Sequence, residues 1–228
     1  MSNAGPHHGL TCIARYMQYD QHLHTGRYAI NPGEGAFAVL RRLRNGQQSP
    51  VRLTIPEART TNRLAAILAG KLMLDSAAIA TALADSAICA QAGYDTCTIP
   101  CMFVADTYEV YWNISIDKLI ERMKREHDKF WNEERRTKLQ QAGLTPEEVC
   151  TLASIVDEET ANLAEKPMIA GMYINRLKQN MPLQADPTIK FALKDFALKR
   201  IYRKMLDTDS PYNTYRNTGL PPGPIKIS

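Results

Sequence analysis

Apolar residues recur along the chain with two periods, which predict a few short strands among longer helices. Residues 27–30 and 51–55 alternate as half-buried strands do, and between them Phe37, Leu40 and Leu43 recur at helical spacing. Asn45 and Gly46 are typical of a helix end. The order strand, helix, strand predicts a small β-α-β unit over residues 23–55.

Helical spacing dominates the rest of the chain. The best-marked helix start has Thr145 as N-cap, Pro146 as first helical residue and Glu148 as the capping-box partner. The predicted helices cover residues 60–72, 76–86, 116–134, 146–159 and 166–179, and a loop within residues 97–111 enters a short extended segment. The last of these helices is expected to bury Ile169, Met172, Tyr173 and Leu177. We therefore predict an α+β protein in which a mainly helical domain with short strands follows the small unit.

One acidic residue stands out at the end of the 146–159 segment. Leu152, Ile155 and Val156 share a helical face, and Glu159 follows Leu152 by seven residues, so its carboxylate is expected on the same face. Burial raises the pKa of an acid, which lets a glutamate hold a proton and act as a general acid. The alternative is a structural carboxylate that makes local hydrogen bonds at the helix end.

Composition indicates a folded chain with a core. The 228 residues are 44% hydrophobic and 23% charged, which suits one or two domains and argues against disorder. The net charge is +4, and basic residues are interleaved with acidic ones, so no nucleic-acid partner is expected, although a weak attraction to an anionic polymer stays open. The five cysteines include no CxxC pair, so we expect no metal and no cofactor, with Cys89 and Cys150 as buried small hydrophobes.

The first residues carry no targeting signal that we recognise. No stretch approaches the ~18 to 20 apolar residues that a membrane-spanning helix needs, and no signal peptide is visible. Residues 1–4 have the pattern of a cloning remnant within an N-terminal tail of residues 1–22. We therefore expect that a native leader or anchor has been removed.

Three segments near the C-terminus, residues 183–188, 210–215 and 219–224, are polar or proline-rich where a core element would be apolar. Amide, hydroxyl and phenol groups on rigid loops offer a sugar paired donors and acceptors, and tyrosine adds a flat apolar face. The alternative, ordinary turns with Asn and Pro at their usual positions, is about equally well supported.

The order of these motifs resembles the YceG-like family, the endolytic murein transglycosylases (MltG). The resemblance is carried by Ala153-Ser-Ile-Val-Asp-Glu-Glu-Thr160, Ile174-Asn-Arg-Leu177, Met181-Pro-Leu-Gln-Ala-Asp-Pro-Thr188, Ser210-Pro-Tyr-Asn-Thr-Tyr-Arg-Asn217 and Gly219-Leu-Pro-Pro-Gly-Pro-Ile225. Upstream, residues 25–55 resemble the family's LysM-like subdomain and residues 103–109 a linking motif. This implies a LysM-like unit at residues 23–55 and a YceG-like catalytic domain at residues 56–228.

The resemblance implies an enzyme that cuts peptidoglycan strands internally between N-acetylmuramic acid and N-acetylglucosamine, leaving a 1,6-anhydro-muramyl end. The family's single essential glutamate corresponds to Glu159. The implied cleft residues are Gln184, Asp186, Thr188, Tyr212, Asn213, Thr214 and Tyr215. The implied partners are glycan strands and peptidoglycan synthases. The implied location is the bacterial cell envelope, with the full-length protein anchored in the cytoplasmic membrane and this part outside the cytoplasm.

Two departures from the family pattern matter. The usual Glu-Lys-Glu-Thr is here Asp157-Glu158-Glu159-Thr160, which adds negative charge and is expected to raise the pKa of Glu159. The family's sequence also continues beyond the 219–224 segment, whereas this chain stops at Ser228. Either the chain has been truncated or the protein is naturally short, and in both cases we expect part of the cleft wall to be missing.

Two other functions compete with this hypothesis. The chain could be a LysM-like module that binds peptidoglycan without catalysis. A pyridoxal-phosphate lyase is the third hypothesis, but it would need a Schiff-base lysine and a phosphate-binding loop, and the sequence contains no glycine-rich loop of that kind.

Overall fold

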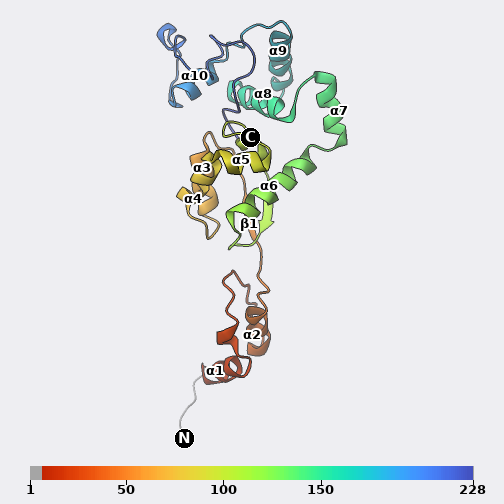
Figure 1. Cartoon of the computed structure of the whole chain (residues 1–228), viewed down its shortest axis with the longest axis vertical. Helices are drawn as coiled ribbons and strands as arrows, with labels where there is room; N and C mark the ends of the chain where they lie inside the picture. The colour runs from red at the N-terminus through yellow and green to blue at the C-terminus, as the bar shows by residue number, and fades with distance from the viewer. Residues whose placement is uncertain (1–6, 228) are drawn as a thin grey trace.

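The computed structural model describes residues 7–227, with side chains from residue 11 onward. The predicted α+β class is confirmed. The molecule is elongated, with α1 and α2 at one end, β1 and α3–α6 in the middle, and α7–α10 at the other end (Figure 1). The elements are α1 (His7–Tyr16), α2 (Ala36–Arg44), β1 (Val51–Thr54), α3 (Thr61–Ala69), α4 (Ser76–Ala84), α5 (Ser86–Ala92), β2 (Thr107–Val110), α6 (Ile116–Phe130), α7 (Glu133–Ala142), α8 (Pro146–Glu159), α9 (Lys166–Lys178) and α10 (Asp186–Ala192), with 3-10 helices at Tyr19–Gln21, Ile99–Met102 and Arg203–Met205.

None of the described helices is long and apolar enough to cross a membrane. The expected cloning remnant, residues 1–4, lies outside the described residues.

The predicted β-α-β unit is only partly formed, and its LysM-like character is not confirmed. The helix is present as α2, but residues 27–30 form no strand. The Ser49 amide donates to the Arg27 carbonyl oxygen at 2.8 Å, and the Ala29 amide donates to Ser49 Oγ at 2.9 Å. Pro50 follows and has no N–H to extend these contacts into a ladder.

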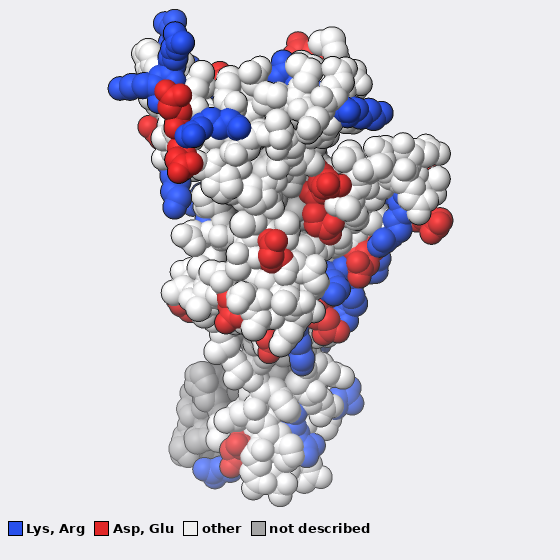
Figure 2. All heavy atoms as spheres, turned by 45° about the horizontal axis from the view of Figure 1, so that its top comes forward, with Lys and Arg blue, Asp and Glu red and all other residues white. Residues whose placement is uncertain are grey.

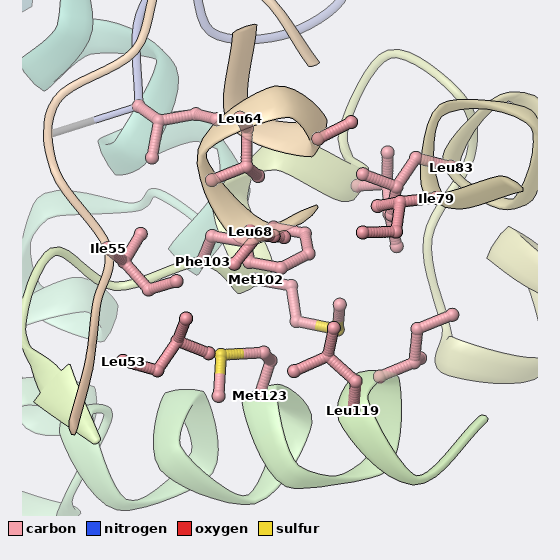
Figure 3. Packing of buried hydrophobic residues seen from close by; sticks show 14 of the residues in the cluster. Leu53, Ile55, Leu64, Leu68, Ile79, Leu83, Met102, Phe103, Leu119 and Met123 are labelled. Atoms are coloured by element: carbon pink, nitrogen blue, oxygen red, sulfur yellow. The ribbon is translucent and has the colours of Figure 1, made fainter. Parts of the chain in front are cut away.

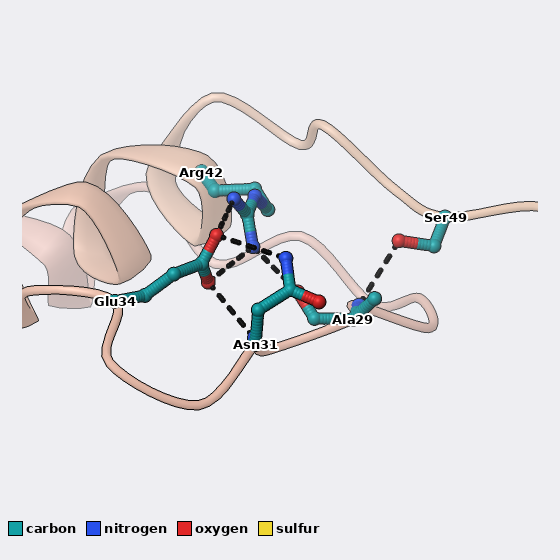
Figure 4. Close-up of polar contacts among 5 residues, drawn as sticks. All are labelled: Ala29, Asn31, Glu34, Arg42 and Ser49. Atoms are coloured by element: carbon teal, nitrogen blue, oxygen red, sulfur yellow. Dashed lines mark hydrogen bonds and ion pairs between the residues drawn. The ribbon is translucent and has the colours of Figure 1, made fainter.

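An ion pair holds the turn that leads into α2. Arg42 donates to both carboxylate oxygens of Glu34, at 2.8 and 2.5 Å, and the Asn31 amide donates to Glu34 at 3.1 Å (Figure 4). These bonds, chiefly the one from Arg42, lower the pKa of Glu34 to about 2. Before β1, the unit therefore relies on polar contacts, since Leu40 is the only buried apolar residue within residues 23–50.

The strand expected at residues 51–55 is confirmed as β1, but it pairs antiparallel with β2, more than fifty residues later in the chain. Val51 faces Val110 and Leu53 faces Tyr108, and these four side chains are buried, whereas Arg52 and Thr54 point to solvent. The predicted alternation is therefore correct. The expected domain boundary between residues 55 and 56 lies just after β1, and β1 packs in the middle of the molecule.

The middle of the molecule is built around one apolar cluster, which we call the first core. Leu64 and Leu68 of α3 pack there with Leu53 of β1, and Leu119 and Met123 of α6 close it from below (Figure 3). Each of these side chains is at most 2% exposed. Burial of this kind stabilises by roughly 25 cal/mol per Å² of apolar surface removed from water.

Two predicted helices are each divided in the structure. The 76–86 helix ends at Ala84, and Asp85 caps a further helix, α5, by accepting from the amides of Ala87 and Ile88. The 116–134 helix ends at Phe130, and the Asn132 side chain caps α7 by accepting from the Arg135 amide. Asp and Asn favour N-cap positions because their side chains satisfy free amides at a helix start. These two caps, which the periodicity does not reveal, redirect the chain.

A smaller apolar cluster, the second core, lies between α8, α9 and the segment before α10. It contains Leu152, Ile155, Val156, Tyr173, Leu183, Ala185 and Ile225. The prediction for α9 is correct for Tyr173 but wrong for Met172, which is 43% exposed, while Ile169 and Leu177 are half-buried. Cys89 is buried as expected, whereas Cys150 is only half-buried beside Cys101.

The C-terminal segment joins the two cores. The Ile225 amide donates to Ser154 Oγ of α8 at 3.0 Å, and Ile227 pairs with Ala58 in both directions, at 3.1 and 2.7 Å. Gly223 approaches the Cys97 carbonyl so closely that a Cβ atom at this position would lie 2.1 Å from its oxygen. This close approach is the physical reason for a glycine in the proline-rich segment.

Candidate active site

Glu159 is the last residue of α8, and its side chain is exposed. The capping box at Thr145 and Glu148 starts this helix as predicted. Leu152, Ile155 and Val156 are buried as predicted, but the expectation that Glu159 is buried with them is wrong. The apolar residues that cover this face of α8 extend along it to Val156, so the final turn projects beyond the second core.

Tyr173 of α9 holds the carboxylate of Glu159. Its hydroxyl donates to Glu159 Oε1 at 2.8 Å, while its ring is buried in the second core. Burial, followed by this hydrogen bond, raises the pKa of Tyr173 well above its usual value. The phenol therefore stays protonated and remains a donor. It fixes Oε1 of the carboxylate, whereas Oε2 has no hydrogen-bond partner among the described residues.

The two predicted binding loops are joined to each other through Thr214. The Gln184 amide donates to the Thr214 carbonyl at 3.0 Å, and the Ala185 amide donates to Thr214 Oγ1 at 3.0 Å. The hydroxyls of Thr188 and Thr214 lie 2.9 Å apart, and Thr188 also donates to the Ala185 carbonyl. Both threonines are at most 1% exposed. They therefore hold the loops and are not available to touch a ligand.

Tyr215 and Asp186 bring these joined loops toward Glu159. The Tyr215 hydroxyl donates to Asp186 Oδ1 at 2.6 Å. Burial raises the pKa of Tyr215 to about 12, helped by this bond and by the negative charges of Asp186 and Glu159. The negative charge of Glu159 contributes to the raised pKa of both Tyr173 and Tyr215, and we call these three residues the cluster around Glu159. Asp186 is exposed and Tyr215 is half-buried, and both can meet a ligand.

Arg176 of α9 fixes the loop before Asp186. Its guanidinium donates to the Leu183 carbonyl at 2.6 Å and lies 3.4 Å from Gln184 Oε1. Gln184 itself has a positive φ of 54°, an unfavourable conformation for a residue other than glycine. The surrounding bonds maintain this strained geometry, and the side chain of Gln184 is exposed to solvent.

Asn213 organises the second loop from inside. Its amide donates to the carbonyls of Leu206 and Thr208 at 2.9 and 2.8 Å, and its oxygen accepts from the Tyr215 amide at 3.0 Å. The side chain is fully buried. Asn213 therefore orients Tyr215, and it does not face a ligand.

Tyr212 does not join the cluster around Glu159. Its ring packs on Phe191 with centroids 4.7 Å apart, and it lines a cavity of about 470 Å³ that also contains Cys97 and Arg59. Of the seven expected cleft residues, Gln184, Asp186 and Tyr215 thus have accessible side chains in the loops next to Glu159. Thr188, Asn213 and Thr214 support them from inside, and Tyr212 faces another cavity.

The two acids before Glu159 are neutralised by ion pairs. Lys166 Nζ lies 2.5 Å from Asp157 Oδ1. Arg59 lies 2.9 Å from Glu158, and Lys226 lies 3.8 Å from it. The negative charge that Asp157 and Glu158 add beside Glu159 is therefore offset by cations from other segments. The lysine that the family usually has at position 158 is replaced here by an acid with cations from other segments around it.

Sequence reasoning missed the roles of Tyr173 and Arg176. Tyr173 was expected to pack in the core, which is correct for its ring, but its hydroxyl reaches Glu159 from a different helix. Arg176 lies within a family-like motif, and nothing in the spacing of that motif reveals that its target is the backbone of residues 182–183. Both contacts join segments that only the packing of α8 and α9 brings together.

Comparisons with known proteins found relatives of this sequence and one similar solved structure. An endolytic murein transglycosylase of Streptococcus pneumoniae serotype 2 (strain D39 / NCTC 7466) is 31% identical over 252 residues, covering 96% of this chain and 45% of the relative. One of Bacillus subtilis (strain 168) is 51% identical over 75 residues, 33% of this chain and 21% of the relative. The crystal structure of a YceG-like protein from Listeria monocytogenes has a TM-score of 0.66 and 27% identity, covering 94% of this chain and 76% of that one.

The chain spans less than half the length of the S. pneumoniae relative. The model of the YceG-like family matches residues 5–228. Because this match covers nearly the whole sequence, the chain belongs to the YceG-like family.

Proposed function

We propose that this chain is a peptidoglycan lytic transglycosylase that cleaves glycan strands internally, with Glu159 as its catalytic residue. The observation that carries the proposal is the Glu159 carboxylate, which is held by the Tyr173 hydroxyl at 2.8 Å beside the loops of Asp186 and Tyr215. Family membership and relatives described as endolytic murein transglycosylases support the same reaction.

The reaction needs one carboxyl group that first donates and then accepts a proton. Protonated Glu159 gives its proton to the glycosidic oxygen as the bond from the muramyl anomeric carbon breaks, and the N-acetylglucosamine chain leaves with a new hydroxyl. The 6-hydroxyl oxygen of the muramyl residue then attacks the anomeric carbon, and the Glu159 carboxylate takes its proton. The product is the 1,6-anhydro ring, no water is consumed, and the glutamate regains its starting form.

The exposure of Glu159 is compatible with this chemistry. A glycan strand that lies across the end of α8 would displace water from the carboxyl group, and loss of water favours the neutral, proton-bearing form of an acid. Tyr173 fixes Oε1, so Oε2 is the oxygen that exchanges the proton. Participation of the substrate's N-acetyl group replaces the second carboxylate that most glycosidases use.

We assign the other groups by their access to a ligand. Gln184, Asp186 and Tyr215 contact the sugars, whereas Thr188, Asn213 and Thr214 position the loops. Glycan strands are the substrate and peptidoglycan synthases are the proposed partners. The full-length protein acts in the cell envelope from an anchor in the cytoplasmic membrane, with this part outside the cytoplasm and a LysM-like unit at residues 23–55.

The direct test is Glu159→Gln, which keeps the shape and the bond from Tyr173 but removes the exchangeable proton. Release of anhydro-muropeptides from purified sacculi, measured by chromatography and mass spectrometry, should fall by roughly 10² to 10⁴-fold. The matched control is Asp157→Asn on the same helical turn, whose carboxylate pairs with Lys166, and its activity should stay within a few-fold of the unaltered protein. Anhydro product released at the normal rate by Glu159→Gln would contradict the proposal. If the unaltered protein bound sacculi and gave no anhydro product, it would instead be a peptidoglycan-binding module.

A further inference from the structure

A pocket lies near the end of α8, and the reaction at Glu159 leaves it unexplained. This cavity of about 470 Å³ is lined by three aromatic residues, Phe191, Phe196 and Tyr212, and by three cations, Arg59, Lys194 and Lys226. Its size suits one or two sugar rings or a short peptide, since ligand pockets usually measure roughly 300 to 1,000 Å³.

The aromatic side chains form a connected apolar surface in this pocket. Phe191 lies between the other two rings, with centroids 4.7 Å from Tyr212 and 6.2 Å from Phe196. The Arg59 guanidinium lies 5.4 Å from the Phe196 centroid. A flat apolar surface with a cation at its edge suits a ligand that has both an apolar face and a negative charge.

The three cations that line the pocket differ in whether they already form ion pairs. Arg59 and Lys226 both approach Glu158, and Lys226 also lies 2.7 Å from Glu57. Lys194 is exposed and forms no ion pair with another described residue. It is therefore the pocket cation that is free to meet an anion.

Lys194 belongs to a strongly basic segment, residues 190–204. This segment contains six cations and one acid, Asp195, and none of the six forms an ion pair within the described part of the chain: Lys190, Lys194, Lys199, Arg200, Arg203 and Lys204. Lys and Arg side chains gather at the upper left of the molecule, over the region that follows α10 (Figure 2). The expectation that basic residues are interleaved with acidic ones does not hold for this segment, and its local positive field attracts anions.

The pocket and Glu159 lie on two sides of the end of α8. Glu158 points toward the pocket, because its partners Arg59 and Lys226 line it. Glu159, the next residue, points toward Tyr173. A polymer that reaches both the pocket and the Glu159 carboxylate therefore has to cross the end of α8.

We propose that this pocket, with the basic segment 190–204, binds a carboxylate-bearing part of the glycan strand while neighbouring sugars lie at Glu159. The inference rests on the proposed function for the identity of the polymer. The carboxylate comes either from the lactyl group of a muramyl residue without its peptide or from the peptide stem. The aromatic surface receives the apolar face of the ligand, and Lys194 receives the charge.

Binding of three soluble probes separates these sources. The probes are glycan fragments with peptide stems, the same fragments after enzymatic removal of the stems, and neutral chitin oligosaccharides. Binding is measured by calorimetry on the full chain with Glu159→Gln, so that no probe is cleaved. Both carboxylated probes should bind more tightly than the neutral one. A preference for stem-bearing fragments would assign the carboxylate to the stem, and a preference for stripped fragments to the lactyl group.

The decisive variant is Lys194→Asn in the same background. Asparagine tolerates the positive φ of 55° at this position better than most residues. Affinity for the carboxylated probes should fall roughly tenfold, while affinity for chitin oligosaccharides stays unchanged. The matched control is Lys71→Asn, an exposed lysine at the end of α3 far along the chain from the basic segment, and it should change neither affinity.

Three results would overturn the inference: no preference for the carboxylated probes, an unchanged affinity in Lys194→Asn, or an equal loss in Lys71→Asn. The Phe196→Ala variant gives an independent check. Because it removes part of the aromatic surface, it should weaken the binding of all three probes. In the active protein, Lys194→Asn should raise KM and leave kcat unchanged. If Glu159 proves not to be catalytic, the binding data still test whether the pocket binds the carboxylated probes. The two proposals can therefore fail separately.

Discussion

The first and second cores are stabilised in different ways, and this difference separates folding from chemistry. The first core joins β1, β2 and α3–α6 through apolar side chains, with Leu53, Leu64 and Leu68 fully buried. The region of the second core adds buried polar residues, Ser154, Thr188, Asn213 and Thr214, and each has a specific hydrogen-bond partner. Apolar burial is non-directional, whereas hydrogen bonds fix direction and distance. The region with directional contacts is the one that positions Glu159 and its loops.

The largest expected effect is a loss of stability in the first core. Leu68→Ala removes a fully buried side chain of α3 and should lower the free energy of unfolding by about 2 to 5 kcal/mol, because it leaves a cavity. Urea unfolding followed by circular dichroism measures the change. The control, Leu163→Ala, alters a side chain that is 76% exposed and should change stability by less than about 0.5 kcal/mol. Below its melting temperature, Leu68→Ala should keep normal kcat, and a large fall in kcat would show that the two regions are not separate.

Asn213→Ala should affect both stability and activity. It leaves the carbonyls of Leu206 and Thr208 without their donor and frees the Tyr215 amide, which should cost about 1 to 3 kcal/mol and misplace Tyr215. Thermal melting and anhydro-muropeptide release measure the two effects. Asn213→Asp keeps the acceptor for Tyr215 but loses the donors, so it should retain more activity than Asn213→Ala. Equal activity in the two variants would show that orientation of Tyr215 is unimportant.

Tyr173→Phe should mainly change catalysis. It keeps the buried ring and removes the hydroxyl that donates to Glu159, so kcat should fall about tenfold, which corresponds to about 1.4 kcal/mol, with little change in KM. Steady-state kinetics on soluble glycan measures both constants. Tyr111→Phe is the control, because this tyrosine is 54% exposed and directly follows β2, outside the second core. A rise in KM at constant kcat would mean that the hydroxyl binds substrate and does not hold the carboxylate.

The smallest expected effect is a pH dependence in the middle of the molecule. His127 of α6 is buried against Tyr94 and Trp131, and this burial lowers its pKa below the ordinary value of 6.5. The unfolded chain therefore binds the proton more readily, so the free energy of unfolding is highest above pH 6.5 and falls as the pH drops below it, by at most about 1.4 kcal/mol at pH 5.5. Denaturation curves at pH 7.5 and 5.5 measure the change, and His127→Leu should reduce it. If His127→Leu showed the same pH dependence of the free energy of unfolding, other titratable groups would be its cause.

Sequence periodicity was sufficient for most elements because their signals are local. The capping box at Thr145 and the stripe Leu152, Ile155 and Val156 depend only on neighbouring residues, and both are confirmed. The predictions that failed depend on distant contacts. The strand expected at residues 27–30 lacks a partner ladder, and β1 pairs with a strand that no local pattern connects to it.

The sequence by itself identified Glu159 and the two loops as the candidate site, and it placed most of the helices. Only the tertiary structure decided that Glu159 is exposed, that Tyr173 holds it, that Thr188, Asn213 and Thr214 work from inside, and that Tyr212 faces a different pocket. The physical reason is that periodicity gives the direction of a side chain around its own helix. Whether that side chain is buried depends on which other segments pack against it. Along α8 the second core ends at Val156, so it does not cover Glu159.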